Sequence, residues 1–237
     1  MPAHLRIAID GPAGSGKSTI GERLARRLGY LYVDTGAMYR AMTVLALTRD
    51  VDPSDGDVLG ELAERTPIQI MPPTQDDGRQ YTVLLDGRDV TGELRSPEVE
   101  AAISRISGHL RVRAAMRARQ RALADAGGVV MVGRDIGTVV LPDADLKIYL
   151  MVAAAERARR RHDDLVRAMG VAAPPYAEVL AEIERRDELD APQMRIADDA
   201  VRIHTDTLQA DDVVARILAL IDALPGQHRW APRGLER

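Results

Sequence analysis

The sequence has no cysteine and no phenylalanine, and aromatic residues make up only 3% of its 237 positions. The lack of cysteine excludes disulfides, zinc ribbons and thiol catalysis, and it fits a reducing compartment. Without phenylalanine the core must be largely aliphatic. Any stacking on a nucleotide base then falls to one of the six tyrosines or to the plane of an arginine.

Long apolar runs and a strong charge of one sign are also missing. No stretch reaches the roughly 18 consecutive apolar residues of a membrane span, and the N-terminus lacks the apolar run of a signal peptide. The formal net charge is only −4, which gives no general case for a membrane surface or a nucleic-acid polymer as a partner. We therefore expect a cytoplasmic protein with small-molecule partners.

The most informative segment that is present is a phosphate-binding loop. Residues 11–18 read GPAGSGKS and fit the pattern G-x-x-x-x-G-K-[ST] at every fixed position. A strand-like segment, residues 5–9, precedes the loop, and an amphipathic helix pattern follows it. In such a loop the backbone N–H groups point at phosphate oxygens. Lys17 is expected to reach the β- and γ-phosphates, and the Ser18 hydroxyl to bind Mg²⁺.

The alternative interpretation is a glycine-rich turn that carries a lysine by chance. Among the 32 basic residues only Lys17 and Lys147 are lysine, and all the others are arginine. A random basic residue at position 17 would therefore be arginine, whose planar fork does not replace a compact ammonium group in this loop. The sequence predicts that the protein binds a nucleoside triphosphate.

Short apolar segments separated by helical patterns run along the chain. They predict an α/β fold in which a five-stranded parallel sheet is covered by helices on both faces. The expected strands are residues 5–9, 30–33, 129–132, 146–150 and 200–203.

Two segments interrupt this alternation. Residues 67–90 combine short apolar stretches with polar turns, which predicts a small inserted antiparallel β segment. Residues 155 to about 190 contain a cluster of arginines, a Pro174-Pro175 break and a second helical pattern. This pattern predicts a helical lid over phosphates, although each arginine of the cluster could equally belong to a solvated helix face.

Two further motifs follow the second and third expected strands. Residues 34–40 read DTGAMYR, and residues 133–135 read GRD. The C-terminal ends of parallel strands meet at one edge of the sheet, so both motifs are expected beside the phosphate-binding loop, where they could line an acceptor site. Taken alone, the first could be a helix N-cap with a surface arginine, and the second a β-turn pair.

With these motifs the chain, from about residue 7 to residue 224, resembles the bacterial type of cytidylate kinase within the nucleoside monophosphate kinase family. No Asn-Lys-x-Asp guanine motif occurs, and the third strand does not end in the acidic residues of motor ATPases. The segments that carry the resemblance are IDGPAGSGKST at 9–19, DTGAMYR at 34–40, GRDVTGELR at 87–95, GRDIGTVV at 133–140, PDA at 142–144 and RDELD at 186–190.

The resemblance implies an enzyme of pyrimidine nucleotide metabolism that transfers the γ-phosphoryl group of ATP to CMP or dCMP, with Mg²⁺ as cofactor. It implies a P-loop core of residues 1–60 and 125–224, which includes the lid, and a nucleoside monophosphate-binding insert of residues 61–124. The punctuation of residues 225–237 by proline and glycine predicts a flexible tail. We expect a monomer, because one chain can build the whole acceptor site.

The resemblance also assigns roles to individual residues. The residues that would align the phosphates during transfer are Lys17, Arg40, Arg134 and Arg186. The donor ATP would be held by Gly11, Pro12, Ala13, Gly14, Ser15, Gly16, Lys17, Ser18, Thr19 and Arg157, and the metal by Ser18. The acceptor would be held by Asp34, Thr35, Tyr39, Arg40, Ser104, Arg113, Arg134, Asp135 and Asp190. Of these, Ser104, Arg113 and Asp135 match the positions that recognise cytosine.

The sequence departs from the family pattern at one position. Three residues after Asp190 the family usually carries a second lid arginine, and Gln193 stands there in this chain. Arg195 could supply the charge from a shifted position. The remaining alternatives are a kinase for another small acceptor, UMP or AMP, and a P-loop regulatory NTPase that signals through a partner.

Overall fold

The central sheet of the computed structural model, which describes residues 4–225, has five strands in the order β2-β6-β1-β7-β8. Every neighbouring pair runs parallel. The strands are β1 (Arg6–Asp10), β2 (Leu31–Asp34), β6 (Val129–Gly133), β7 (Leu146–Met151) and β8 (Val201–His204). The predicted five-stranded parallel sheet is confirmed, with each expected strand within one residue of its observed bounds.

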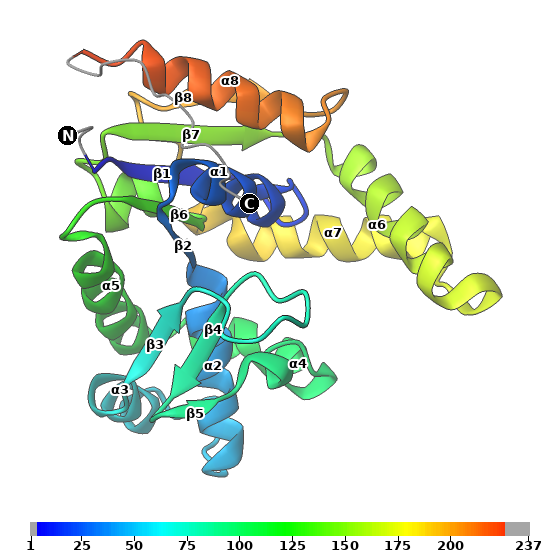
Figure 1. The fold of residues 1–237 in the computed structure, drawn as a ribbon. Helices are drawn as coiled ribbons and strands as arrows, with labels where there is room; N and C mark the ends of the chain where they lie inside the picture. Colours follow the sequence, from blue (N-terminus) through cyan, green and yellow to red (C-terminus); the bar gives the residue numbers. More distant parts are fainter. Residues whose placement is uncertain (1–3, 226–237) are drawn as a thin grey trace.

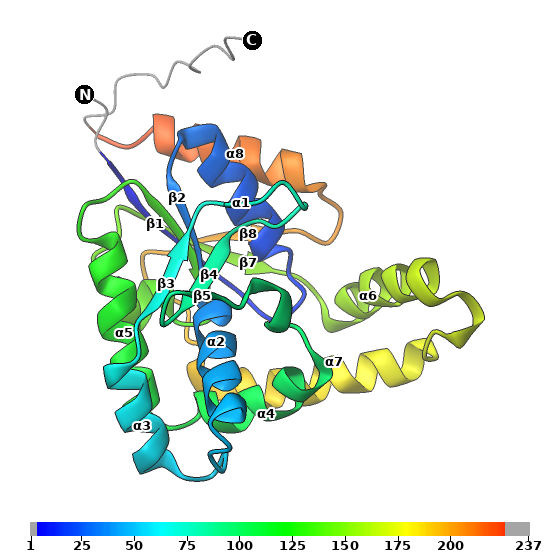
Figure 2. The same ribbon diagram turned by 60° about the horizontal axis from the view of Figure 1, so that its bottom comes forward.

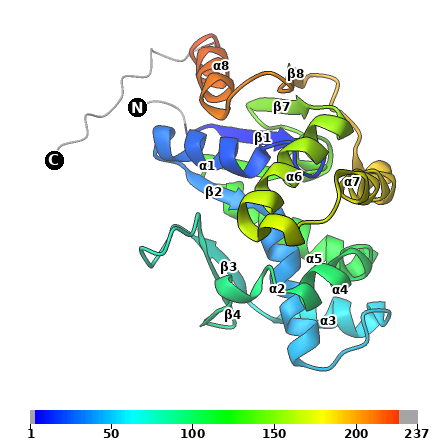
Figure 3. The ribbon, with the colours of Figure 1, turned by 90° about the vertical axis from the view of Figure 1, so that its right-hand side faces the viewer.

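Helices cover both faces of this sheet, as predicted (Figure 3). On one face lie α1 (Lys17–Leu28) and α8 (Ala210–Asp222), and on the other lie α5 (Leu110–Ala124) and the end of α7 (Tyr176–Asp190). The core between them is aliphatic with methionine, as the lack of phenylalanine requires. Its fully buried side chains include Ile7, Ile9, Leu24, Met131 and Ile148.

The strand order determines where the functional segments meet. The central strand β1 lies between β6 and β7, and the phosphate-binding loop leaves its C-terminal end. The segments after β2 and β6 leave the same edge, because all the strands run in one direction. Ligands of open parallel sheets bind outside this edge, where neighbouring strands continue into different elements.

The inserted segment forms a second, antiparallel sheet in the order β3-β4-β5. Figure 1 shows this sheet beside α2 (Thr35–Thr48), which extends from the end of β2 into the insert. The other elements of this part are α3 (Gly56–Arg65), β3 (Ile68–Met71), β4 (Thr82–Leu85), β5 (Arg88–Asp89), the 3₁₀ turn η1 (Thr91–Glu93) and α4 (Pro97–Ser107). The predicted domain boundary after residue 60 falls within α3.

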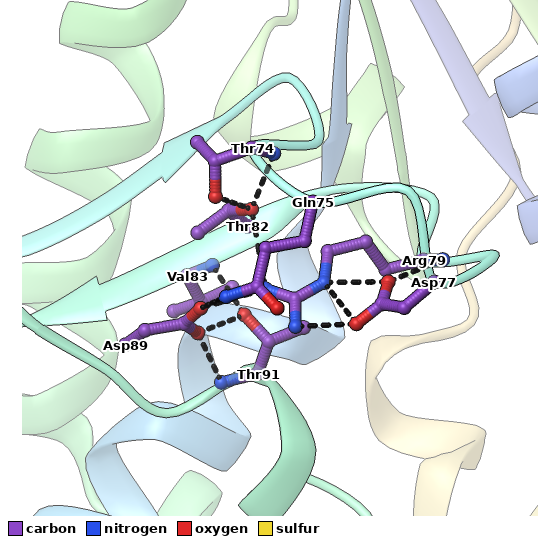
Figure 4. Close-up of polar contacts among 8 residues, drawn as sticks. All are labelled: Thr74, Gln75, Asp77, Arg79, Thr82, Val83, Asp89 and Thr91. Atoms are coloured by element: carbon purple, nitrogen blue, oxygen red, sulfur yellow. Dashed lines mark hydrogen bonds and ion pairs between the residues drawn. The ribbon is translucent and has the colours of Figure 1, made fainter.

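A polar network holds the loop between β3 and β4. Figure 4 shows Arg79 between two carboxylates, Asp77 and Asp89, each 2.6 Å from the guanidinium. Asp89 also accepts a hydrogen bond of 2.6 Å from the Thr91 hydroxyl. The network joins the loop to β5, so this small sheet does not depend on apolar burial alone.

Two helices, α6 (Ala154–Met169) and α7, project from the core where the sequence predicts a helical lid (Figure 2). A short 3₁₀ turn, η3 (Gly170–Ala172), joins them, and η4 (Ala191–Gln193) follows α7. Within residues 4–225 no helix is long and apolar enough to cross a membrane. The predicted tail lies, apart from Pro225, outside the described residues.

Candidate active site

The phosphate-binding loop takes a backbone path that needs glycine at two positions. Gly16 adopts a left-handed conformation with φ of +86° just before α1 begins. A Cβ at Gly11 would lie 2.7 Å from the carbonyl oxygen of Leu150 in β7, which no side chain tolerates. The loop therefore passes close to the neighbouring strand and leads into the start of a helix, where an anion is favoured.

Lys17 is folded onto this loop. Its Nζ donates to the carbonyl oxygen of Pro12 at 2.7 Å and to Oγ of Ser15 at 3.4 Å. Burial lowers the pKa of Lys17 well below its usual range, and the positive charge of Arg134 adds to the effect. A bound phosphate chain would reverse this shift, because it would supply negative charge beside the ammonium group.

Ser18 and Asp34 form a second contact at this edge of the sheet. The Ser18 hydroxyl lies 3.2 Å from Oδ2 of Asp34, and Oδ1 of Asp34 accepts the backbone N–H of Gly36 at 3.0 Å. No cluster of three or more metal-ligating side chains occurs within residues 4–225. Mg²⁺ in nucleotide sites needs no such cluster, since it keeps waters and phosphate oxygens as ligands. One hydroxyl and one carboxylate fit that mode of binding.

Asp10, the last residue of β1, is a site residue that the sequence analysis did not select. It is buried, and its two carboxylate oxygens accept the backbone N–H groups of Ile136 and Gly137, both at 2.8 Å. Burial raises its pKa to about 6. The carboxylate thus holds the π-helical turn η2 (Ile136–Val140) that follows Arg134 and Asp135. The sequence signal that could have identified Asp10 is its place as a single acidic residue at the end of an apolar strand.

The acceptor-side residues after β6 lie in a set of ion pairs. Arg134 contacts Asp190 at the end of α7 at 2.8 Å, and Arg113 of α5 contacts Asp135 at 2.6 Å. The Arg113 guanidinium also lies over the Tyr39 ring, 5.8 Å from its centre, within the range of a cation–π contact. The structure thus brings together five of the predicted acceptor residues from four different elements.

Glu100 of α4 is a second residue that the sequence analysis missed. It pairs with Arg40 at 2.9 Å and lies 3.8 Å from Arg186 of α7. Burial alone would raise the pKa of Glu100, but the charge and hydrogen bond of Arg40, together with the charges of Arg186 and Arg95, lower it overall. One carboxylate therefore gathers two of the arginines that were predicted to bind phosphate.

Two predicted acceptor residues, Thr35 and Ser104, do not take part in these ion pairs. Thr35 is buried, and its hydroxyl donates to the carbonyl oxygen of Val132 at 2.9 Å, which joins α2 to β6. Ser104 is exposed on α4. Within the described chain its hydroxyl is not hydrogen-bonded to Arg113 or Asp135. The roles of both residues remain predictions.

The lid arginines divide into two kinds. Arg159 is largely exposed and pairs with Glu156 and Asp163 of its own helix, as expected of a solvated face. Arg157 is buried, pairs with Asp187 of α7 and donates to the carbonyl oxygen of Ala13 at 3.0 Å. It therefore joins both lid helices to the phosphate-binding loop.

Arg157 also borders a cavity beside that loop. The cavity has a volume of about 560 Å³ and is lined by Pro12, Tyr149, Met151, Met194, His204 and Asp206, among others. In the described part of the chain, Nε of Arg157 is buried without a hydrogen-bond partner. The role of Arg157 on the donor side therefore stays a prediction, which its contact with the phosphate-binding loop supports.

A phosphate-binding loop on a parallel core, an inserted segment at the same sheet edge and an arginine-bearing lid define a phosphotransferase of the P-loop class. The chain belongs to the cytidylate kinase family, whose model matches residues 7–223. The resemblance noted from the motifs is thereby confirmed.

The similarity to individual relatives extends over nearly the whole chain. A cytidylate kinase of Roseiflexus castenholzii is 51% identical over 222 residues, which cover 93% of this chain and 95% of the relative. One of Herpetosiphon aurantiacus is 49% identical over 216 residues, or 91% and 93% of the two chains. Among solved structures, a shikimate kinase from Bacteroides thetaiotaomicron aligns with 93% of this chain and 99% of its own, at 17% identity and a TM-score of 0.49.

Proposed function

We propose that this protein transfers the γ-phosphoryl group of ATP to CMP, giving ADP and CDP, and that dCMP is a second acceptor. The observation that carries the proposal is the Arg113–Asp135 pair at the sheet edge of the phosphate-binding loop. Cytosine has an exocyclic amine, which needs an acceptor such as the Asp135 carboxylate. Its O2 and N3 need donors, which the Arg113 guanidinium supplies.

The donor side rests on the phosphate-binding loop. Lys17 neutralises the β- and γ-phosphates, while backbone N–H groups of the phosphate-binding loop hold their oxygens. Mg²⁺, when bound, neutralises further phosphate charge, and Ser18 with Asp34 would hold it. Asp34 would also orient a water of that ion. Arg157 would contact the donor from the lid, because it already touches the loop at Ala13.

The acceptor phosphate would be held by Arg40 and Arg134. Both arginines are paired with carboxylates, Glu100 and Asp190, on elements that border the site. A phosphate group offers the same bidentate geometry as a carboxylate and a higher charge. Substrate would therefore replace these carboxylates as the partner of each arginine and set the two anions in line for transfer.

Arg186 lies on the lid and would complete this cluster when the lid closes. Closure excludes water from the γ-phosphate, because water there would hydrolyse ATP without transfer to the acceptor. No general base is needed, since positioning and charge stabilisation supply most of the catalysis in phosphoryl transfer. Because one chain supplies every residue named here, we also propose that the enzyme acts as a monomer. We propose separately that it works in the cytoplasm.

The test is ATP- and Mg²⁺-dependent release of ADP with CMP, dCMP, UMP, AMP, GMP or no acceptor, with Lys17→Ala as control. Release confined to the cytidine nucleotides and lost in Lys17→Ala is the expected result. Release with UMP or AMP alone would support a kinase but would overturn the assignment of cytosine as the acceptor base. Release without any acceptor would favour the regulatory NTPase.

A further inference from the structure

The lid ends in a contact with the residue pair that we assign to the acceptor base. The side-chain oxygen of Gln193, the last residue of η4, accepts a hydrogen bond of 3.0 Å from Nη1 of Arg113. Nη2 of the same guanidinium donates to Asp135 at 2.6 Å. Arg113 is thus held by two partners from different parts of the chain.

A second contact lies three residues earlier on the same segment. Asp190, at the end of α7, pairs with Nε of Arg134 at 2.8 Å. Arg134 directly precedes Asp135, so Asp190 contacts the segment after β6 directly. Gln193 reaches the same segment through Arg113 of α5, which pairs with Asp135. Any movement of α7 that separates Asp190 from Arg134 would also pull Gln193 away from Arg113.

The chemistry of position 193 fits this arrangement. An arginine there, as the family usually has, would bring a second positive charge against the Arg113 guanidinium, and like charges at contact distance repel. The glutamine amide is neutral and presents an acceptor, so Arg113 can keep its ion pair with Asp135. Arg195 borders the same cavity of about 630 Å³ as Gln193 and Arg113, but within residues 4–225 its guanidinium donates no hydrogen bond to the Gln193 side chain.

We propose that Gln193 is a positioning residue that holds Arg113 in the orientation that reads the acceptor base, and so couples the lid to acceptor recognition. This inference rests on the proposed function, because it takes Arg113 and Asp135 as the acceptor-base contacts. The position of the lid then depends on the orientation of Arg113, which the bound acceptor base would stabilise.

A double-mutant cycle on the full chain tests this coupling. Kinetics and CMP-binding calorimetry would compare the wild type with Gln193→Ala, Arg113→Ala and the double variant. A hydrogen bond to a charged group supports an expected rise of about 10-fold or more in the KM for CMP in Gln193→Ala. The KM for ATP should change by less than about 2-fold, and in the Arg113→Ala background the same substitution should have almost no effect.

The remaining variants separate the possible failures. Gln193→Glu keeps an acceptor for Arg113 and should retain CMP affinity, whereas Gln193→Arg should weaken it. Gln69→Ala, an exposed glutamine of β3, is the matched control. A loss that is the same with or without Arg113, or equal for ATP and CMP, would overturn the coupling. If Arg113→Ala itself left the KM for CMP unchanged, the proposed acceptor site would fail instead.

Discussion

The Ser18 hydroxyl donates a hydrogen bond of 3.2 Å to Oδ2 of Asp34, and this contact joins the start of α1 to the end of β2. The other oxygen of Asp34 caps α2 through the N–H of Gly36. One carboxylate therefore serves both the insert and the phosphate-binding loop. Its position ties the acceptor side of the site to the proposed metal position.

Replacing Asp34 by asparagine tests that position. We expect the Mg²⁺ concentration for half-maximal activity to rise about 10-fold or more, because a charged ligand of the ion is lost. The thermal midpoint should move little, since the asparagine oxygen can still cap α2. Asp55→Asn is the control, because Asp55 caps α3 in the same way through the N–H of Val58. An unchanged Mg²⁺ requirement in Asp34→Asn would remove Asp34 from the metal site.

Arg186→Ala should lower kcat far more than it weakens CMP binding. The lid arginine would meet the phosphates only in the closed state, so we expect a loss of roughly 100-fold in kcat and a change in KM of a few-fold. Arg185 is its matched control, because this exposed neighbour pairs with Glu182 of its own helix and, within residues 4–225, with no other acid. The measurement is the kcat and the KM for CMP of the Arg186→Ala and Arg185→Ala variants in steady-state kinetics. Equal losses in kcat and CMP affinity would make Arg186 a ground-state contact.

The buried pair of Arg157 and Asp187 should contribute to stability. Asp187→Asn leaves the Arg157 charge buried without its partner, which costs about 1–3 kcal/mol in the free energy of unfolding, since Asp187 is partly exposed to solvent. Urea denaturation measures the change. Glu182→Gln removes a surface pair on the same helix and should cost less than about 0.5 kcal/mol. Similar losses in the two variants would show that burial of Arg157 does not matter.

The raised pKa of Asp10 predicts a pH dependence of stability. Between pH 3.8 and about 6 the native state holds a proton on Asp10 that the unfolded chain has released. The contribution of Asp10 is therefore fully present below the lower pH and is lost as pH rises through the upper one.

The measurement is the difference in unfolding free energy between the wild type and Asp10→Asn, followed from pH 4 to pH 7. In this difference the other carboxylates cancel. We expect the wild type to lose up to about 3 kcal/mol relative to the variant across that range. A difference that is constant with pH would mean that Asp10 has an ordinary pKa.

The parallel sheet and the phosphate-binding loop could be predicted because both leave local signals. Mostly apolar segments of four or five residues mark the strands, and the loop has a fixed spacing of glycine, lysine and serine. The position of residues 133–135 beside the loop could then be predicted as well, because parallel strands end at one edge of the sheet.

The partners of the arginines left no such signal. Glu100 lies on an amphipathic helix that also carries Glu98, and nothing in that pattern distinguishes a solvated acid from one that gathers Arg40 and Arg186. The contact between Arg113 and Gln193 spans 80 positions. Which lid arginine is buried depends on the face that α6 turns toward α7. The family resemblance singled out Arg157, but only the packed structure shows that Arg157 is buried and Arg159 is exposed.

The ratio of kcat/KM for CMP to that for UMP, in the wild type and in Asp135→Asn, tests the assignment of the acceptor site most directly. In the proposed site Asp135 would accept from the cytosine amine, whereas an asparagine can also donate to the carbonyl that uracil has there. We predict a wild-type preference for CMP that falls at least about 10-fold in the variant. No preference in the wild type, or a ratio that the substitution leaves unchanged, would contradict the assignment.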